Sequence, residues 1–432
     1  MRATPARKVL LGGLALLLAV LATAASARAD AVTDWNEVAA AALQSSGAAT
    51  PPGAGQGAVS TVHLAMVHGA VYDAVNAIDG RHKPYVSSPE AEPWYSQDAA
   101  VAAAARHVLL NGGLGIPAAR IPLIEAAYEA TLQPIPDGPA QAGGIATGES
   151  AAADMLDARA GDGRFGEFRF SESTLPGGWR LVPPATVTDP GAWLKDVTPF
   201  VLRKPNRFRG RAPYRLRSRA YAADFNEVKA IGRATESTRT PDQTAAAEYW
   251  GTTNATATMA SVIRSVASGQ GGTLSDHARL LARTYTNASD ALIVTWRDKA
   301  RYSFWRPFTA IREAASDGNR ATKADPDWTS PIAPPPYPEH PSGLSTFGSA
   351  VAHTMQHFYR RDGATFTGTT PGGVTRQFTS FSQLTEDIVE ARIWSGIHFR
   401  FADEEGARIG RKVARWGNKH AFRRSRHWHH RG

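Results

Sequence analysis

Apolar residues recur at three- and four-residue spacing along most of the chain, which is the pattern of amphipathic helices. In the first half the pattern covers four Ala-rich segments, which we predict as helices over 59–78, 96–110, 117–132 and 140–158. Strand-like alternation is scarce. The chain is therefore predicted to be all-α, with a first helical bundle over residues 30–160.

Between residues 161 and 216 the periodicity gives way to Gly, Pro, Trp and Arg, with turn signals such as Leu175–Gly178. We predict a long connection here, followed by a second bundle over 217–432. One helix start is clear, because Thr240–Gln243 combines an N-cap, a proline at the first helical position and a glutamine able to close a capping box. Later helices are predicted over 275–296, 345–358, 382–395 and 403–419.

The first residues resemble an export signal. Arg2, Arg7 and Lys8 precede an apolar run over 9–22, and small residues follow up to Ala29. This is the pattern of a secretory signal peptide cleaved near Ala29, so residues 1–29 are predicted to be removed and the protein secreted. The apolar run is too short to cross a bilayer, and no membrane insertion is expected. The chain has no cysteine, which excludes disulfides and thiolate metal sites.

The formal charge of +9 is concentrated at the two ends, because residues 30–407 carry a net charge of −4. No nucleic-acid partner is predicted. The basic stretch after Arg408 fits either a solvated terminal helix or a patch for acidic polymers. His427, His429 and His430 receive no native function.

Three ordered motifs carry chemistry. Lys299 and Arg306-Pro307 form Lys-x6-Arg-Pro, Pro341-Ser342-Gly343 opens a helix, and Arg392 and His398 form Arg-x5-His. A tetrahedral oxyanion requires such groups: guanidinium forks, an ammonium, a hydroxyl and backbone N–H groups at a helix N-terminus. Glycine also allows the backbone to approach the ligand closely. We predict a pocket for vanadate or phosphate built from Lys299, Arg306, Ser342, Gly343, Arg392 and His398.

These motifs resemble those of the vanadium-dependent haloperoxidases, which share their pocket with the type-2 phosphatidic acid phosphatases. The shared signature is Lys-x6-Arg-Pro, then Pro-Ser-Gly-His, then Ser-Arg-x5-His followed by an acid, which is Asp403 here. The resemblance implies two four-helix bundles. It also implies that His398 binds vanadium or attacks phosphorus. Lys299, Arg306 and Arg392 would then neutralise the equatorial oxygens, and Ser342 and the Gly343 amide would complete the hydrogen bonds.

Two aromatic residues favour the peroxidase branch. Trp296 stands three residues before Lys299, and Tyr337 follows two prolines shortly before Pro341. Chloroperoxidase-like members carry tryptophan and Pro-Pro-Phe at these places, on the halide side of the pocket. An apolar wall suits a halide nucleophile because it limits hydration. Packing in the core explains both aromatic residues equally well.

One position departs from the signature. Leu344 stands where the family has a histidine that hydrogen-bonds the apical oxygen and manages protons, and leucine can do neither. A phosphatase should suffer more than a peroxidase, because expelling an alkoxide without an acid is costly. His340 is the nearest substitute in the sequence, although the proline and the helix start are expected to point it elsewhere. His353 and His357 have zinc spacing but lack the intervening glutamate.

The leading hypothesis is a secreted vanadium-dependent haloperoxidase. With vanadate as its cofactor it would use hydrogen peroxide to oxidise halide to a hypohalous species, which a small organic acceptor then consumes. One alternative is an exported acid phosphatase with phosphate in the same site and His398 as covalent nucleophile. Another is a catalytically impaired oxyanion-binding protein, which Leu344 motivates.

Overall fold

The computed structural model describes residues 30–44, 51, 53–55, 57–251 and 254–425. Helices dominate this part of the chain, and its only strands form one two-stranded antiparallel sheet. The prediction of an all-α protein is therefore confirmed. The predicted leader and the terminal histidines lie outside the described residues.

The first half contains the four predicted helices and one more. The predicted start at Pro117 was too early, because Ala118–Arg120 forms a separate 3-10 turn before the α-helix begins. The helix over Ala31–Ala42 was not predicted, although Asp30 closes a capping box at its start. The elements are α1 (Ala31–Ala42), α2 (Gly57–Asp79), α3 (Gln97–Asn111), α4 (Ile121–Leu132) and α5 (Pro139–Ala158).

Close packing of α3 against α5 explains the Ala/Gly-rich composition of this half. A Cβ atom on Gly144 would lie 2.3 Å from the carbonyl oxygen of Ser96, and one on Gly148 would lie 2.4 Å from that of Ala100. Both distances are far below van der Waals contact. Only glycine allows the two backbones to approach this closely.

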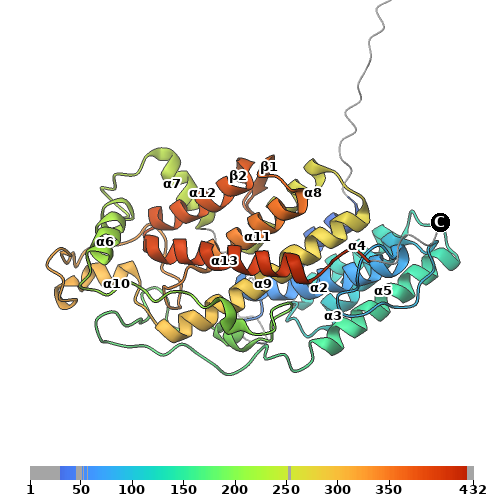
Figure 1. Cartoon of the computed structure of the whole chain (residues 1–432), viewed down its shortest axis with the longest axis horizontal. Helices are drawn as coiled ribbons and strands as arrows, with labels where there is room; N and C mark the ends of the chain where they lie inside the picture. Colours follow the sequence, from blue (N-terminus) through green and yellow to red (C-terminus); the bar gives the residue numbers. More distant parts are fainter. Residues whose placement is uncertain (1–29, 45–50, 52, 56, 252–253, 426–432) are drawn as a thin grey trace, which may run out of the picture.

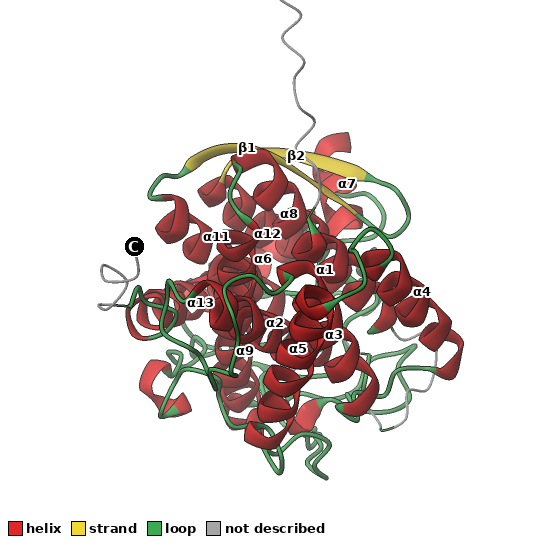
Figure 2. Cartoon of the chain, turned by 90° about the vertical axis from the view of Figure 1, so that its right-hand side faces the viewer, coloured by secondary structure: helices red, strands yellow, loops and turns green. Residues whose placement is uncertain are grey.

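The second half contains the predicted helices, several that were not predicted, and a β-hairpin. The elements are α6 (Arg219–Ile231), α7 (Pro241–Trp250), α8 (Ala255–Gln270), α9 (Leu274–Tyr302), α10 (Pro307–Arg312), α11 (Gly343–Tyr359), β1 (Gly363–Thr369), β2 (Thr375–Ser380), α12 (Phe381–Trp394) and α13 (Arg400–His420). The capping box at Thr240 is present as predicted. In the hairpin, which lies along one side of the helices (Figure 2), Phe366 pairs with Phe378.

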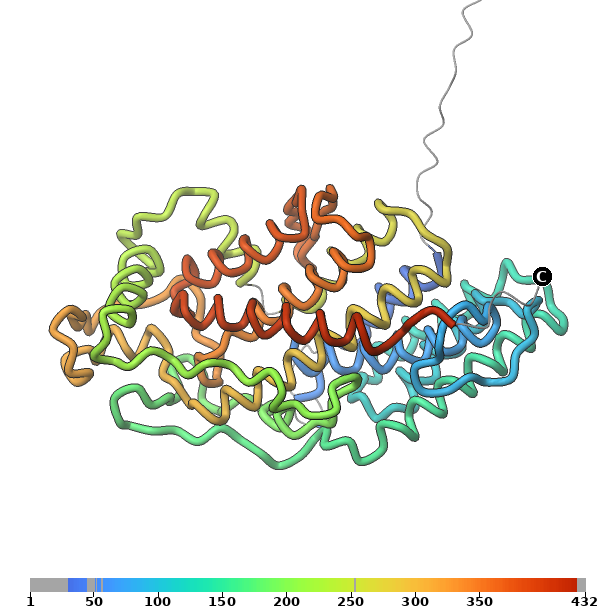
Figure 3. The backbone as a smooth tube through the Cα atoms, in the orientation of Figure 1, coloured from blue at the N-terminus to red at the C-terminus, as the bar shows by residue number. Residues whose placement is uncertain are grey.

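The long helix α9 is the axis of the molecule. It was predicted to end near Trp296 but continues to Tyr302, since no Gly or Pro interrupts it before Ser303 adopts a left-handed φ of 40°. Figure 1 shows α2, α3 and α5 at one end, and α6 and α10 at the other. The tube in Figure 3 follows α13 alongside α9. Lys299 consequently lies inside the last turn of α9.

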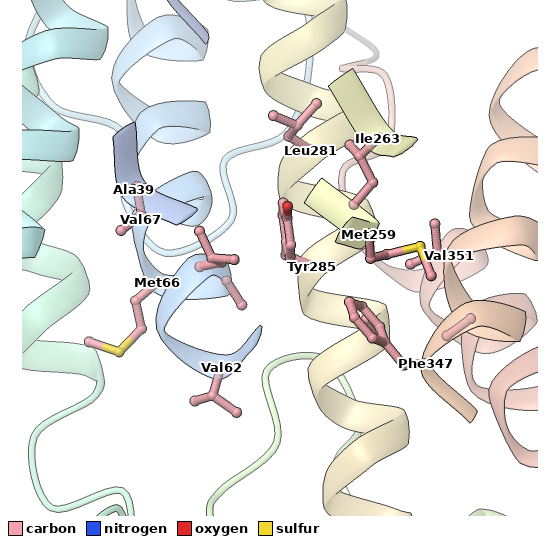
Figure 4. Close-up of a cluster of buried hydrophobic side chains, with 14 of the residues drawn as sticks. Ala39, Val62, Met66, Val67, Met259, Ile263, Leu281, Tyr285, Phe347 and Val351 are labelled. Carbon is pink, nitrogen blue, oxygen red and sulfur yellow. The ribbon is translucent and has the colours of Figure 1, made fainter. Parts of the chain in front are cut away.

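One continuous apolar core joins the two halves. Buried side chains of α2, such as Met66, belong to the same cluster as Leu281 of α9, Met259 of α8 and Phe347 of α11 (Figure 4). Because α9 contributes to the cores of both halves, neither half buries its apolar face alone. The division into bundles at residues 160 and 217 stays a prediction.

Between α5 and α6 the chain forms a long irregular segment, called the connection below, with two 3-10 turns, Ala192–Asp196 and Pro205–Phe208. Buried carboxylates of α9 fix it in place. Asp290 accepts the backbone N–H groups of residues 200–202 at 2.5–2.8 Å, and Asp298 accepts that of Gly210 at 2.6 Å. These bonds replace the helical partners that the irregular backbone lacks.

His68 and Asp73 are buried polar groups of α2. His68 Nε2 lies 2.9 Å from Asn36 Nδ2, and its ring stacks on Tyr285. Asp73 accepts three backbone N–H groups from residues 85–87. Among the residues described here, no helix is long and apolar enough to cross a bilayer.

An ion pair between Asp30 and His277 should stabilise the fold within a defined pH window. Asp30 Oδ2 lies 2.6 Å from His277 Nδ1 and joins α1 to α9. Burial works against both charges, but the hydrogen bond and mutual attraction lower the pKa of Asp30 below 3.8 and raise the pKa of His277 above 6.5. The aspartate contribution is lost as pH falls through its lowered pKa, and the histidine contribution as pH rises through its raised pKa.

We expect Asp30→Asn, which keeps the N-cap, to lower the free energy of unfolding by about 1–3 kcal/mol between pH 4 and 6.5, and by less outside this window. Urea unfolding at several pH values measures the difference. Asp34→Asn is the matched control, since Asp34 lies exposed in the same helix without an ion pair among the described residues. A pH-independent loss for Asp30→Asn would contradict the assignment.

Candidate oxyanion site

The six predicted site residues lie at the ends of helices that converge in the second half. Lys299 is in the last turn of α9, and Arg306 is the N-cap of α10. Ser342 is the N-cap of α11 and Gly343 its first residue. Arg392 is in the last turn of α12, and His398 is in the loop before α13. The exposed fractions are 0% for Lys299, Arg306 and Ser342, 2% for His398 and 7% for Arg392.

Backbone carbonyls hold the three buried cations. Lys299 Nζ donates to the carbonyl oxygens of Pro338 and Glu339, at 2.7 and 3.0 Å. Arg306 donates from Nε to Tyr337 at 3.0 Å and from Nη1 to Ile397 at 2.9 Å. Arg392 donates from Nη1 to the carbonyl oxygen of Trp250 at 2.9 Å. Neutral acceptors fix the positions of these side chains but leave their charge uncompensated.

None of the three cations forms an ion pair with a carboxylate in the described part of the chain. Arg306 Nη2 and Arg392 Nε are also buried without a hydrogen-bond partner there. Buried donors on charged groups are costly when unpaired. These free donors fit a tetrahedral oxyanion, whose oxygens would accept from them.

The pKa values of the three cations also agree with a site for an anion. Burial lowers the pKa of Lys299 well below its usual value, and the charge of Arg306 lowers it further. Burial also lowers the pKa of Arg306, to about 10, and that of Arg392. A bound anion would favour the charged form of each.

Hydrogen bonds on both ring nitrogens fix the tautomer of His398. Nε2 lies 3.2 Å from Nη1 of Arg306, and Nδ1 lies 3.1 Å from Oε1 of Glu339. A guanidinium only donates, so Nε2 must accept, and Nδ1 carries the hydrogen that Glu339 accepts. Burial and the nearby cations lower the pKa of His398 and keep it neutral. Nε2 thus presents a lone pair on the side of Arg306, as a metal ligand requires.

Glu339 was not predicted as a site residue. It is fully buried, and burial raises its pKa to about 8 against the opposing charges of Arg306 and Lys299. Its Oε1 also accepts the backbone N–H of Phe399 at 3.0 Å. The available signal was an acid two residues before Pro341 of the motif, but the sequence does not reveal that it faces His398.

A row of hydroxyls leads from Ser342 to a second buried acid. Ser342 Oγ donates to Ser345 Oγ at 3.2 Å, and Ser345 Oγ donates to Asp403 Oδ1 at 2.7 Å. Burial raises the pKa of Asp403 to about 7, although hydrogen bonds from both serines oppose this. Ser345 was not predicted, and Asp403 was noted only as the acid beyond the last motif.

Gly343 and the two aromatic residues border the cations. A Cβ atom on Gly343 would lie 3.0 Å from Cζ3 of Trp296, so the indole packs directly on the start of α11. The rings of Trp296 and Tyr337 are 5.4 Å apart, and Lys299 Nζ lies 4.9 Å from the Tyr337 centroid. Trp296 Nε1 donates to Asp189, a buried acid that was not predicted. Both aromatics therefore lie beside the cations, and their role toward halide stays a prediction.

Neither Leu344 nor His340 takes the place of the missing histidine. Leu344 is half-buried against the apolar core. His340 Nε2 lies 2.8 Å from the carbonyl oxygen of Arg211, and its ring packs on Tyr302 and Phe401, so this side chain is engaged elsewhere, as expected. The described residues contain no group of three or more His, Cys, Asp or Glu able to hold a metal ion, and this leaves His353 without a zinc site.

Two sequence comparisons find similarity to vanadium chloroperoxidase. A family model described as the second helical-bundle domain of VCPO matches residues 279–427. Vanadium chloroperoxidase of Curvularia inaequalis is 36% identical over 94 residues, which is 19% of this chain and 15% of that protein. The aligned segment is thus a small part of the curated relative.

The fold is that of solved bacterial haloperoxidases. A bacterial vanadium-dependent iodoperoxidase superposes with a TM-score of 0.74 at 19% identity, over 91% of this chain and 96% of that one. A holo-type bacterial vanadium-dependent chloroperoxidase gives 0.68 at 18% identity, over 88% and 94%. At these identities the likeness concerns the fold.

Orthovanadate should raise the thermal unfolding midpoint of the protein, because only the folded site gathers the three cations. At a concentration 100 times its Kd the stabilisation would be about 2.7 kcal/mol. We expect Arg392→Met to lose most of this response. Its stability without vanadate should change little, since the variant removes an unpaired buried charge.

Arg283→Met is the matched control. Arg283 is also buried and donates to backbone carbonyls, those of Asn418 and Ala421, but it lies outside the site. Differential scanning fluorimetry with and without vanadate gives the shift for each variant. A full shift in Arg392→Met would remove Arg392 from the site.

Proposed function

We propose that this chain, which is vanadium haloperoxidase-like in part of its sequence and in its fold, is a secreted enzyme that uses hydrogen peroxide and vanadate to oxidise halide. One observation carries the proposal: three buried cations have no carboxylate partner among the described residues, two of them, Arg306 and Arg392, keep an unpaired donor, and the Nε2 lone pair of a neutral histidine faces Arg306. When bound, vanadate supplies a Lewis acid that polarises peroxide for attack by halide without changing its own oxidation state.

The chemistry balances with one proton. Hydrogen peroxide, a halide ion and a proton give a hypohalous acid and water, so the halide loses two electrons and the O–O bond accepts them. A small organic acceptor then consumes the hypohalous acid. The protein must hold the anion, keep His398 neutral and move protons, and its own residues are suited to these three tasks.

Lys299, Arg306 and Arg392 bind and orient the anion. Their carbonyl partners leave them little freedom, so little reorganisation is needed when charge develops on the oxygens. The Ser342 hydroxyl and the amide of Gly343 at the start of α11 add donors, because the first N–H groups of a helix have no helical partner.

His398 serves as the metal ligand through Nε2, and Glu339 positions it. Glu339 accepts the hydrogen of Nδ1, which orients the ring and keeps Nε2 unprotonated. Arg306 Nη1 must give up its hydrogen bond to Nε2 when the ligand binds. The oxygens of the anion offer it a stronger, charged acceptor.

Protons released from peroxide pass along Ser342 and Ser345 to Asp403. The family histidine is replaced by Leu344, so another group must hold the proton. Asp403 is the acid connected to the pocket by hydroxyls, and its pKa of about 7 suits proton transfer near neutral pH. The same acid returns the proton as the hypohalous product forms.

Leu344 also favours a second candidate, an oxyanion-binding protein with impaired catalysis. In that case the pocket would hold vanadate or phosphate without turning over. A phosphatase with His398 as nucleophile would use the same pocket, and its leaving group would require an acid at the position that Leu344 occupies. One set of assays distinguishes the three functions.

Purified protein should brominate a phenolic dye with peroxide only after vanadate is added, and His398→Ala should abolish the reaction, because the metal loses its protein ligand. Nitrophenyl phosphate is tested in parallel. Phosphate-ester hydrolysis inhibited by vanadate would favour the phosphatase. Absence of both activities, with vanadate still protecting against heat, would favour the binding protein.

Asp403→Asn should lower the bromination rate at neutral pH by about 100-fold, the contribution of a general acid–base group, and remove the pH dependence near 7. Vanadate binding should be retained, as the thermal shift will report. Adding Leu344→His to this variant should restore much of the rate, since it supplies the proton-holding group of the family signature. An unchanged pH profile in Asp403→Asn would exclude this proton route.

A further inference from the structure

A second cationic site lies between the connection and the end of α13. It is a surface groove of about 840 Å³, which is large enough for a ligand of several sugar-sized units. None of the oxyanion-site residues contributes to it. Its walls are Val201, Arg203, Lys204, Asn206 and Arg207 on one side and Trp416, His420 and Arg423 on the other.

The groove concentrates positive charge without compensation. Arg203, Lys204, Arg207 and Arg423 are all exposed, and no acid lines the groove. Within the described ranges none of the four forms an ion pair. Arg400, by contrast, contacts two glutamates. Four like charges around one groove repel each other unless an anion occupies it.

The stability of α13 explains the basic residues on only one wall of the groove. Cations near the C-terminal end of α13 interact favourably with the helix dipole, which accounts for His420 and its neighbours. Arg203, Lys204 and Arg207 belong to the irregular connection and its 3-10 turn over Pro205–Phe208, where no helix dipole attracts them. Their position opposite α13 therefore requires another explanation.

Trp416 holds the groove in shape. The guanidinium carbon of Arg207 lies 3.7 Å from the Trp416 ring centroid, and the His420 ring stacks on the same indole at 3.6 Å. Phe208 packs edge-on at 6.2 Å. Arg207, fixed in this way, loses little entropy on binding a ligand. The indole is already engaged, so it does not offer the open stacking face that single-stranded nucleic acids use.

Positive charge continues beyond the groove along α13. Lys412, Trp416 and His420 follow each other at four-residue spacing, so Lys412 extends the groove wall by one turn, about 5.4 Å. Arg415 and Lys419 are exposed beside them, and no acid occurs from Arg408 to the end of the chain. The charge distribution thus suits a linear ligand with repeated anionic groups rather than one small anion.

The remaining wall residues favour a ligand with hydroxyl groups. Asn206 accepts a hydrogen bond from Arg297 through Oδ1, which leaves its amide N–H groups as donors. Val201 adds apolar surface beside these donors. We propose that the groove binds a linear acidic polysaccharide, whose carboxylate or sulfate groups pair with Arg203, Lys204, Arg207 and Arg423. The proposal does not depend on the proposed function.

The test uses the full chain and two fluorescein-labelled probes, polygalacturonate for carboxylates and heparin for sulfates. Fluorescence anisotropy measures the binding of each probe. We expect the variant Arg203→Gln/Arg207→Gln/Arg423→Gln to bind the preferred probe at least tenfold more weakly. Its salt dependence should also be shallower, because fewer counterions are exchanged. Tighter binding of one probe identifies the anionic group.

The control Arg215→Gln/Arg219→Gln/Arg320→Gln removes the same charge from exposed residues in and around α6. It should weaken binding by less than twofold. Both variants keep residues 426–432, so any contribution of the tail is common to them. If the groove variant does not fold, as judged by thermal unfolding, Arg423→Gln alone should still weaken binding about threefold.

Equal weakening by the two triple variants would overturn the proposal, because net charge would then explain the binding. No binding of either probe at low salt would also overturn it. Polyphosphate or single-stranded DNA bound as tightly as the polysaccharides would show a general polyanion surface and would reject the polysaccharide. Dye bromination and the vanadate shift should be unchanged in the groove variant, so failure here is distinguishable from failure of the proposed function.

Discussion

Lys299, Arg306 and Arg392 are buried together without a carboxylate partner, and the rest of the site follows from that constraint. Burying a cation is costly unless its charge is compensated. The fold holds these side chains with backbone carbonyls from loops between the helices, which fix geometry without neutralising charge. The consequence is a cluster of fixed, buried positive charge that a bound anion would compensate.

In the described part of the chain the buried acids form no ion pair with these cations, and their hydrogen bonds go to other groups. Glu339 contacts His398, and Asp403 contacts the serines of α11. If either acid paired directly with a cation, it would compete with the oxyanion for the same donors. Burial raises the pKa of both acids, which makes them able to hold a proton near neutral pH. In the proposed function, this separation would allow the same site to bind an anion and to handle protons.

Helix α9 connects this chemistry to the whole fold. Its first turn is joined to α1 through His277, its middle fixes the connection through Asp290, and its last turn carries Lys299. The apolar core shared by the two halves holds this helix in place. The connection it secures also forms one wall of the basic groove, so both cationic sites depend on the same element for their shape.

The sequence by itself determined the helical class and most long helices, and it singled out the six residues that are predicted to form the oxyanion site. Helical periodicity, capping boxes and motif spacing are local properties that short-range physics controls. The β-hairpin was not predicted, although Phe366 and Phe378 are residues that favour strands. Two short strands become stable only when they pack on helices, and the local sequence does not show that packing. Helix α9 ends where Ser303 adopts a left-handed backbone conformation, which no pattern in the sequence predicts.

Tertiary structure alone decided which groups face each other. Glu339 lies 59 residues from His398, Ser345 lies 58 residues from Asp403, and the groove joins residues about two hundred positions apart. Spacing along the chain carries no information about such contacts, since they depend on how helix ends and loops pack. For the same reason the sequence suggested only that basic charge gathers near the C-terminal end of the chain. The fold places the basic end of α13 opposite the cations of the connection, and the two together line the groove.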